Sequence, residues 1–211
     1  MPVKICHIYK SYYPDTFGGV EQVIKTISKH ASRDYEHLLL TTSLSPGRET
    51  LSNLKITRFK QNLNFASTPL SWELLFNYRK LIQQADLLHY HFPWPSADLA
   101  HCLHRIKKTS LVTYHSDIVK QKYLKKIYQP LMHWFLTRVD KIVVTSENYL
   151  HSSKDLQSFR DKCIVVPLGI THDNFTNNPE TLTAIKTKFG KEFVLFLGVL
   201  RYYKGVKTLI Q

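Results

Sequence analysis

Two adjacent glycines, Gly18 and Gly19, follow the first apolar run of the chain and open an amphipathic stretch that contains Glu21. Glycines at the start of a helix let a ligand come close to the backbone, and the free N–H groups and the helix dipole favour an anion. The dinucleotide fingerprint G-x-G-x-x-G and the P-loop pattern are both absent from the sequence. The pair therefore predicts either a phosphate-binding turn or an ordinary turn between a strand and a helix.

A histidine that could act on a sugar stands at the end of a later apolar run, where His115 is followed two residues on by Asp117. A histidine in this position could orient a hydroxyl group or stabilise charge. The chain contains eleven histidines, so a purely structural role is the alternative. The expected place of His115 in a cleft favours a functional role.

Two further histidines, His89 and His91, stand at alternate positions of one expected strand and therefore face the same side. A pair so placed could ligate zinc, but no third or fourth ligand stands at a diagnostic spacing. We therefore predict hydrogen bonding or packing for this pair, and no metal site.

Two cations near the end of the sequence, Arg201 and Lys204, precede Gly205 and an expected helix start. Cations in that place could neutralise a diphosphate, whereas the alternative is a pair of solvated surface charges. The glycine that opens the helix favours the diphosphate.

The chain is strongly basic, with a formal net charge of +13 and a predicted pI of about 9.6. Such a surface favours phosphates, nucleic acid or anionic lipid. The basic region Lys120–Lys126 is followed by bulky apolar residues, so its basic end could lie on an anionic membrane while most of the apolar face packs in the core. A helix-turn-helix, RRM or zinc-finger pattern is absent, so nucleic acid is not a predicted partner.

The segments that must position these residues are short apolar runs that alternate with amphipathic stretches. This alternation predicts a mostly parallel, doubly wound, Rossmann-like α/β sheet, which binds ligands at the carboxyl ends of its strands. Ser146 and Glu147 join the candidate residues at that edge, because they follow the run at 141–146. The expected strands are residues 3–9, 37–42, 56–59, 86–92, 111–115, 141–146, 163–167 and 193–198.

The expected helices connect these strands and have apolar residues at helical spacing. One begins at the glycine pair, and one follows Ser71. Ser96 is expected to cap a third helix that runs to about residue 108. Pro130 is expected to kink or divide a long helical region at 121–139, and a short helix is expected at 181–189.

Three regions follow from this pattern. Residues 1–172 are expected to form one α/β domain, residues 173–190 a linker, and residues 191–211 the first strand and helix start of an incomplete second domain. Three widely spaced cysteines and the lack of a signal peptide or a membrane-spanning run favour a cytoplasmic protein, which could contact the inner membrane face peripherally.

Together these motifs resemble the retaining GT-B glycosyltransferases of family 4. The resemblance rests on the order and spacing of six short segments over nearly the whole chain, because each segment alone is weak. The segment at 200–205, Leu-Arg-Tyr-Tyr-Lys-Gly, is similar to bacterial O-antigen and capsule mannosyltransferases. The six segments are residues 18–21, 86–91, 113–117, 142–146, 165–170 and 196–205.

The resemblance implies two Rossmann-like domains that face each other across a cleft, with the acceptor on the first and a nucleotide-diphosphate sugar on the second. Gly18 and Gly19 would approach the donor phosphates, and Arg201 and Lys204 would hold the diphosphate. His115 would be the catalytic cleft histidine beside the transferred sugar. The remaining residues expected to line the cleft or the acceptor side are Glu21, His91, Asp117, Ser146 and Glu147.

The same resemblance implies a glycan or lipid-linked acceptor, a place in bacterial surface polysaccharide synthesis, and no metal cofactor. Two departures stand against full activity: Val199 occupies the place of the family's usual arginine, and the family's E-x7-E element is absent from the sequence. We therefore expect negligible transferase activity from these 211 residues alone. The alternatives are a non-catalytic module that binds an acceptor or a membrane and, less favoured, a nucleic-acid binder.

Overall fold

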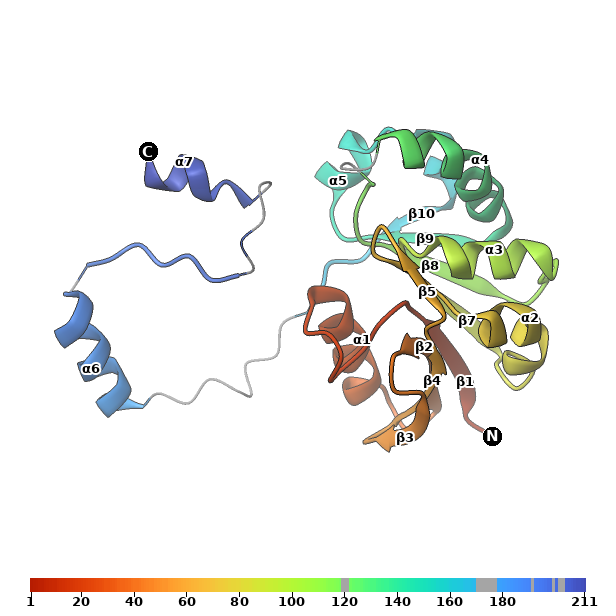
Figure 1. Cartoon of the computed structure of the whole chain (residues 1–211), viewed down its shortest axis with the longest axis horizontal. Helices are drawn as coiled ribbons and strands as arrows, with labels where there is room; N and C mark the ends of the chain where they lie inside the picture. Colours follow the sequence, from red (N-terminus) through yellow and green to blue (C-terminus); the bar gives the residue numbers. More distant parts are fainter. Residues whose placement is uncertain (119–121, 170–177, 191, 199, 201–203) are drawn as a thin grey trace. The chain divides into compact units, whose positions relative to one another are not determined.

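The computed structural model describes residues 1–118, 122–169, 178–190, 192–198, 200 and 204–211. These residues belong to two compact units, Met1–Gly169 and Ile170–Gln211. The first unit is built on one eight-stranded sheet with helices on both faces (Figure 1).

The sheet of the first unit has the strand order β10-β9-β8-β7-β1-β2-β4-β3, and every neighbouring pair is parallel except the pair formed by β3 and β4. The predicted doubly wound, mostly parallel α/β class is therefore confirmed. The strands are β1 (Val3–Ile8), β2 (Tyr35–Ser43), β3 (Gly47–Leu51), β4 (Leu54–Lys60), β7 (Leu87–Phe92), β8 (Ser110–Tyr114), β9 (Lys141–Val144) and β10 (Cys163–Val165).

One helix, α1 (Gly19–His30), covers one face of the sheet, where its Ile24 packs in a small core with Leu39 and Ile56. The opposite face carries the larger core, which includes Tyr90 and Phe135. The helices that contribute to this larger core are α2 (Trp72–Leu81), α3 (Pro95–Leu103) and α4 (Lys122–Arg138), and the 3-10 helix η1 (Gln157–Lys162) adds Phe159. A short helix, α5 (Glu147–Ser152), follows β9.

Apolar periodicity in the sequence does not predict two features of the first unit. β3 is exposed along its whole length and pairs antiparallel with β4. A small hairpin joins β5 (Leu63–Phe65) to β6 (Thr68–Leu70), and its turn residues Ala66 and Ser67 have positive φ values of 53° and 62°. Strands this short and this exposed carry no alternating pattern that the sequence could display.

The helix boundaries predicted around Ser96 are wrong. α3 begins two residues earlier than a cap at Ser96 implies, because Pro95 occupies its first turn, where a missing N–H costs nothing. The Ser96 hydroxyl donates instead to the Pro69 carbonyl at 2.9 Å. The helix ends at Leu103 rather than near residue 108, and Arg105 takes a positive φ of 48° in the turn that follows.

The predicted division at Pro130 is not found, because α4 continues through this residue. The alternative of a kink there stays a prediction. A proline removes one helical hydrogen bond, the one that would reach the carbonyl of Lys126. Both residues lie on the exposed side of the helix, where water can bond that carbonyl. The residues before Lys122 that the prediction included lie outside the described part of the chain.

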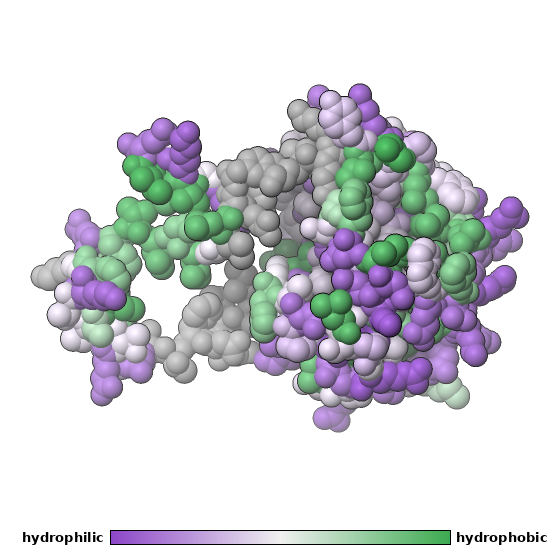
Figure 2. Space-filling view, in the orientation of Figure 1, coloured by the Kyte–Doolittle hydropathy of each residue, from purple (hydrophilic) through white to green (hydrophobic). Residues whose placement is uncertain are grey.

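The second unit contains two helices, α6 (Pro179–Phe189) and α7 (Val206–Ile210), within its described residues. The strand predicted at 193–198 is not formed there, and the side chain of Leu197 is 90% exposed. Figure 2 shows this unit's apolar side chains on the surface. A strand needs a hydrogen-bonded neighbour, and no described residue of this unit supplies one.

Candidate functional site

The glycine turn of the first unit is organised around a buried carboxylate. Gly18 is the N-cap of α1, and Glu21 lies in the first turn of that helix with only 4% of its surface exposed. The Glu21 Oε1 atom accepts hydrogen bonds from the hydroxyl groups of Thr16 at 2.5 Å and Ser11 at 3.1 Å. The turn therefore holds one fixed negative charge beside the N-terminus of α1.

The two glycines differ in what surrounds them. A Cβ atom added at Gly18 would lie 2.4 Å from Glu21 Oε2, whereas one added at Gly19 would meet nothing within 4 Å. Gly18 thus leaves room for the buried carboxylate of Glu21, and Gly19 faces open space that a ligand could enter. The close approach of the Glu21 carboxylate explains the glycine at position 18, and the predicted access for an anion fits the glycine at position 19.

We expect Gly18→Ala to destabilise the first unit by about 1–3 kcal/mol, because the carboxylate of Glu21 must leave both hydroxyl donors. Gly19→Ala is the matched control and should be neutral or stabilising by up to about 1 kcal/mol, as alanine favours a helix. Urea unfolding of the two variants measures the difference. Equal midpoints for the two variants would contradict the assignment.

The predicted histidines come together on the sheet face that carries α1. His91 is buried, and its Nδ1 atom lies 3.1 Å from His115 Nε2. Its other nitrogen, Nε2, lies 3.1 Å from His7 Nδ1, and His7 Nε2 lies 2.9 Å from His37 Nδ1. Neither His7 nor His37 stands out in the sequence, because each is a single histidine within or at the start of an apolar run.

A three-histidine group, His7, His89 and His91, is the one set of described residues whose ligand atoms come within 4.8 Å of one another in a way that could hold a metal. The spacing of the sequence could not show His7 as the third member. The ring nitrogens of His7 and His91 are paired with other histidines, and His89 Nε2 lies 2.7 Å from the Thr113 hydroxyl. Hydrogen bonds thus account for this group.

These imidazoles are neutral at neutral pH. Burial lowers the pKa of His115 to about 4, although the charge of Glu21 acts in the opposite direction. Burial, together with the neighbouring histidines, holds the pKa of His91 and of His7 well below the usual value. A neutral His115 can donate or accept a hydrogen bond at the carboxyl edge of the sheet but carries no charge there.

The other residues predicted at this edge have structural partners. Asp117 accepts hydrogen bonds from the Tyr114 hydroxyl at 3.1 Å and the Ser153 hydroxyl at 2.8 Å. Ser146 caps α5 by accepting from the Tyr149 backbone N–H at 3.2 Å, and Glu147 is exposed in the first turn of that helix. None of the interactions found among the described residues joins Ser146 or Glu147 to His115.

An apolar pocket of about 600 Å³ lies at the carboxyl edge of the sheet. Its walls come from the β5–β6 hairpin, the start of α3 and the first turns of α4, and Lys10 and Asp117 are its charged residues together with Lys125. Lys10 lies two residues beyond the end of β1, and burial lowers its pKa, although the charge of Glu21 opposes this. Lys10 was not among the predicted site residues, and its position after the first strand is the only signal that the sequence offers for it.

The basic end of α4 contributes both structure and surface. Lys125 forms a 2.6 Å ion pair with Asp155, so its charge is already partnered. Lys126 is exposed, and its apolar neighbours Tyr123 and Ile127 are 85% and 79% exposed. Lys120 lies outside the described residues. The described part of the predicted membrane-facing segment is therefore both basic and apolar at its surface.

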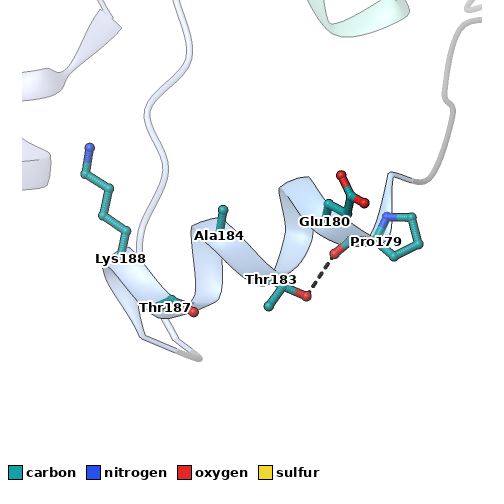
Figure 3. A pocket seen from close by; sticks show the side chains of 6 residues that line it. All are labelled: Pro179, Glu180, Thr183, Ala184, Thr187 and Lys188. Atoms are coloured by element: carbon teal, nitrogen blue, oxygen red, sulfur yellow. Dashed lines mark hydrogen bonds between the residues drawn. The ribbon is translucent and has the colours of Figure 1, made fainter.

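The expected diphosphate residues belong to the second unit. Arg201 and Val199 lie outside the described residues, and Lys204 is exposed just before α7. Figure 3 shows a hollow of this unit that is lined only by residues of α6. Within it, the Thr183 hydroxyl donates to the Pro179 carbonyl at 2.9 Å. One face of a single helix offers no converging polar groups, so we assign no site there.

A mostly parallel sheet with helices on both faces defines an α/β protein of the Rossmann-like class. Its glycine turn, neutral histidine and apolar pocket lie at the carboxyl edge, where such folds bind ligands. The sequence model of Glycosyltransferase Family 4 matches residues 17–174. The chain belongs to this family, as the motifs predicted.

Two curated relatives match nearly the whole chain. The O-antigen chain mannosyltransferase C of Escherichia coli is 39% identical over 99% of this chain, and the D-rhamnosyltransferase WbpZ of Pseudomonas aeruginosa is also 39% identical over 99%. The matches cover 57% and 56% of those proteins, so the chain spans little more than half of their length.

Solved structures support the fold. The Anabaena protein Alr3699/HepE, solved in complex with UDP, aligns with 89% of this chain and 50% of its own length, with a TM-score of 0.60 and 13% identity. The sucrose-phosphate synthase of Thermosynechococcus elongatus aligns with 80% of this chain and 49% of its own, with a TM-score of 0.51 and 16% identity. No helix among the described residues is long and apolar enough to cross a membrane.

Proposed function

We propose that this chain is the acceptor-side part of a retaining glycosyltransferase in bacterial surface polysaccharide synthesis. The reaction would move a hexosyl group from a nucleotide-diphosphate sugar to a glycan or lipid-linked acceptor. The observation that carries the proposal is the convergence of the glycine turn, Glu21 and His115 at one sheet edge beside an apolar pocket, in a member of this family.

The glycine turn supports a role on the leaving-group side of such a reaction. Departure of a diphosphate needs donors and positive potential where its charge develops. The open space in front of Gly19 leaves room for a phosphate at the N-terminus of α1. Lys10 is a cation that interacts electrostatically with Glu21, the carboxylate of the same turn. In the second unit, Arg201 and Lys204 are proposed to hold the same diphosphate.

His115 is proposed to contact the transferred sugar. A neutral imidazole can hydrogen-bond a sugar hydroxyl without placing a competing charge in the cleft. We propose no metal in this reaction, since both ring nitrogens of His7 and of His91 are engaged in hydrogen bonds with other histidines. Addition of a chelator to the transfer assay described below tests that point.

The donor sugar is proposed to have the manno configuration. One relative is named for mannosyl transfer and the other for D-rhamnosyl transfer, and D-rhamnose is 6-deoxy-D-mannose. Mannose and D-rhamnose therefore have the same ring stereochemistry. Mannosyl and D-rhamnosyl donors should both be compared with a glucosyl donor in the assay.

The acceptor is proposed to be lipid-linked, with Lys126 and its apolar neighbours on an anionic membrane. The exposed Ile127 lines the apolar pocket, so one surface could hold both the membrane and the acceptor. Lys126 precedes Ile127 in the chain and is exposed, and the ion pair with Asp155 is formed by Lys125 instead.

We expect the chain to float with vesicles that contain anionic lipid and not with neutral ones. Lys126→Glu should weaken this binding by about tenfold or more, since one lysine near such a surface contributes about 1 kcal/mol and the change reverses its sign. Lys80→Glu, an equal charge change at an exposed position of α2, is the matched control. Equal loss in both variants would point to net charge alone and would remove the α4 surface from the proposal.

A chimera tests the proposed reaction directly. This chain replaces the matching part of the E. coli mannosyltransferase, whose remaining part supplies what the match does not cover. The chimera should transfer sugar from a labelled nucleotide-diphosphate donor to a lipid-linked acceptor, with this chain alone assayed beside it. A folded chimera that transfers none of the three sugars would overturn the proposed function.

A further inference from the structure

Four histidines form a continuous hydrogen-bonded chain across the sheet. His37 lies on β2, His7 on β1 and His91 on β7, and His115 directly follows β8. These four strands are consecutive neighbours in the sheet. Each strand therefore contributes one ring to a row that ends at the proposed cleft.

Every contact in this row joins the same pair of atom types. Nδ1 of His37 meets Nε2 of His7 at 2.9 Å, and Nδ1 of His7 meets Nε2 of His91 at 3.1 Å. Nδ1 of His91 then meets Nε2 of His115 at 3.1 Å. All four rings thus point the same way along the row.

The ring geometry fits hydrogen bonds made edge to edge rather than face to face. The three joined pairs have centroid separations of 5.2, 5.4 and 5.4 Å and interplanar angles between 17° and 26°. His89, which belongs to no link of the row, lies closer over His91, with centroids 4.3 Å apart. Nearly coplanar rings at the larger separation direct each N–H at the lone pair of the next ring.

A neutral imidazole has one donor nitrogen and one acceptor nitrogen, so the row can take only two arrangements that keep every bond. In one arrangement each ring carries its proton on Nδ1, and in the other each carries it on Nε2. A single ring of the opposite kind would set two donors or two acceptors against each other. The tautomer of His115 is therefore tied to those of the three buried rings.

The buried end of the row distinguishes the two arrangements. His37 Nε2 is buried and has no hydrogen-bond partner among the described residues. With protons on Nε2, this end would be an orphaned N–H, the rarer kind of unpaired group in protein interiors. With protons on Nδ1, the orphan is only a lone pair, and the free N–H lies on His115.

We propose that His37, His7 and His91 are positioning residues that, through this single hydrogen-bonded row, hold the proton of His115 on Nδ1. His115 then presents a donor, rather than an acceptor, at the carboxyl edge of the sheet. The use of that donor in catalysis rests on the proposed function. The tautomer itself is a property of this chain and needs no substrate.

Long-range ¹H–¹⁵N correlation spectra of the chain labelled in its histidine rings test the proposal, because they distinguish the two tautomers. At neutral pH the four rings of the row should all carry the proton on Nδ1. Two neighbouring rings with opposite tautomers, or an averaged mixture at His115, would overturn the proposal. A stoichiometric metal ion bound at His7 and His91 would also overturn it, since it would break their bond.

Variants separate positioning from mere packing. His91→Phe removes the donor to His115, whose tautomers should then interconvert and give averaged shifts. His91→Asn keeps an amide donor near the place of Nδ1 and should restore the single tautomer. His89→Phe, a change on the same strand and face but outside the row, should leave His115 unchanged.

The outcome is decided even where one variant fails. If His91→Phe does not fold, the unaltered chain and His91→Asn still give the result. An unchanged His115 spectrum in a folded His91→Phe protein would contradict the positioning role. Because the spectra require no turnover, an inactive chimera would affect the proposed function and leave this inference standing.

Discussion

At about pH 5 the first unit should be several kcal/mol less stable toward urea than at about pH 7.5. Burial lowers the pKa of His89 to about 3 and that of His101 to about 4, whereas an unfolded histidine titrates near 6.5. The unfolded chain thus binds protons that the folded chain refuses. Stability is complete above about pH 6.5 and falls as the pH drops toward the folded values, by about 2 kcal/mol per histidine at pH 5.

One buried carboxyl group acts in the opposite direction. Burial raises the pKa of Asp98 to about 8, so its folded form binds a proton that the unfolded form gives up above about pH 4. This contribution stabilises the fold as the pH falls. Several buried histidines outweigh one carboxyl group, because burial also lowers the pKa of His7, His37 and His91.

Two variants test the assignment of these groups. His101→Gln should make the loss of stability between about pH 7.5 and pH 5 smaller by about 2 kcal/mol. Asp98→Asn should make the loss steeper, since the opposing group is gone. The measurement is urea unfolding followed by the fluorescence of the buried Trp94. A wild-type midpoint that does not change over this pH range would refute the neutral state of the buried histidines.

In the active chimera, His115→Ala should lower kcat by about 10²–10³-fold and change the donor KM much less. The proposed contact of His115 to the sugar strengthens as charge develops during transfer, so its loss falls mainly on the rate. His115 also ends the histidine row, and its loss leaves His91 Nδ1 without a partner. Thermal unfolding of the variant should therefore accompany the kinetics.

An exposed histidine provides the control for this experiment. His151 on α5 has a 3.9 Å contact with Glu147 and is 66% exposed, so His151→Ala should leave kcat within about twofold. A folded His115→Ala chimera that keeps its kcat within about threefold of the unaltered chimera would remove His115 from the catalytic role. The glycine turn would then be the remaining candidate.

Much of the first unit could be predicted from the sequence because parallel strands buried on both faces are apolar runs. The runs that became β1, β2, β7, β8 and β9 were all found. The exposed β3 could not be found, since it buries no face, and the hairpin strands of three residues each are too short to display a period. The apolar run at 193–198 was predicted to be a strand and does not form one. A strand also needs a hydrogen-bonded neighbour, which a local sequence pattern cannot reveal.

The candidate site was predicted in part. His115, Glu21 and the glycine pair follow strands and His91 lies near the end of β7, and the carboxyl ends of parallel strands meet at one edge. Ser146 has a local explanation as a helix cap, which its position before a short helix also fits. Lys10 was missed, because a single lysine after a strand resembles any surface lysine until its burial is known.

The sequence by itself determined the class of fold and the family, because both are written in local periodicity and in the order of short motifs. Tertiary structure alone decided which glycine is needed by Glu21 and which leaves space for a ligand, since that depends on a Cβ distance. It alone joined four histidines from strands far apart in the sequence. Strand order and register set those contacts, and neither is encoded in any one segment of the chain.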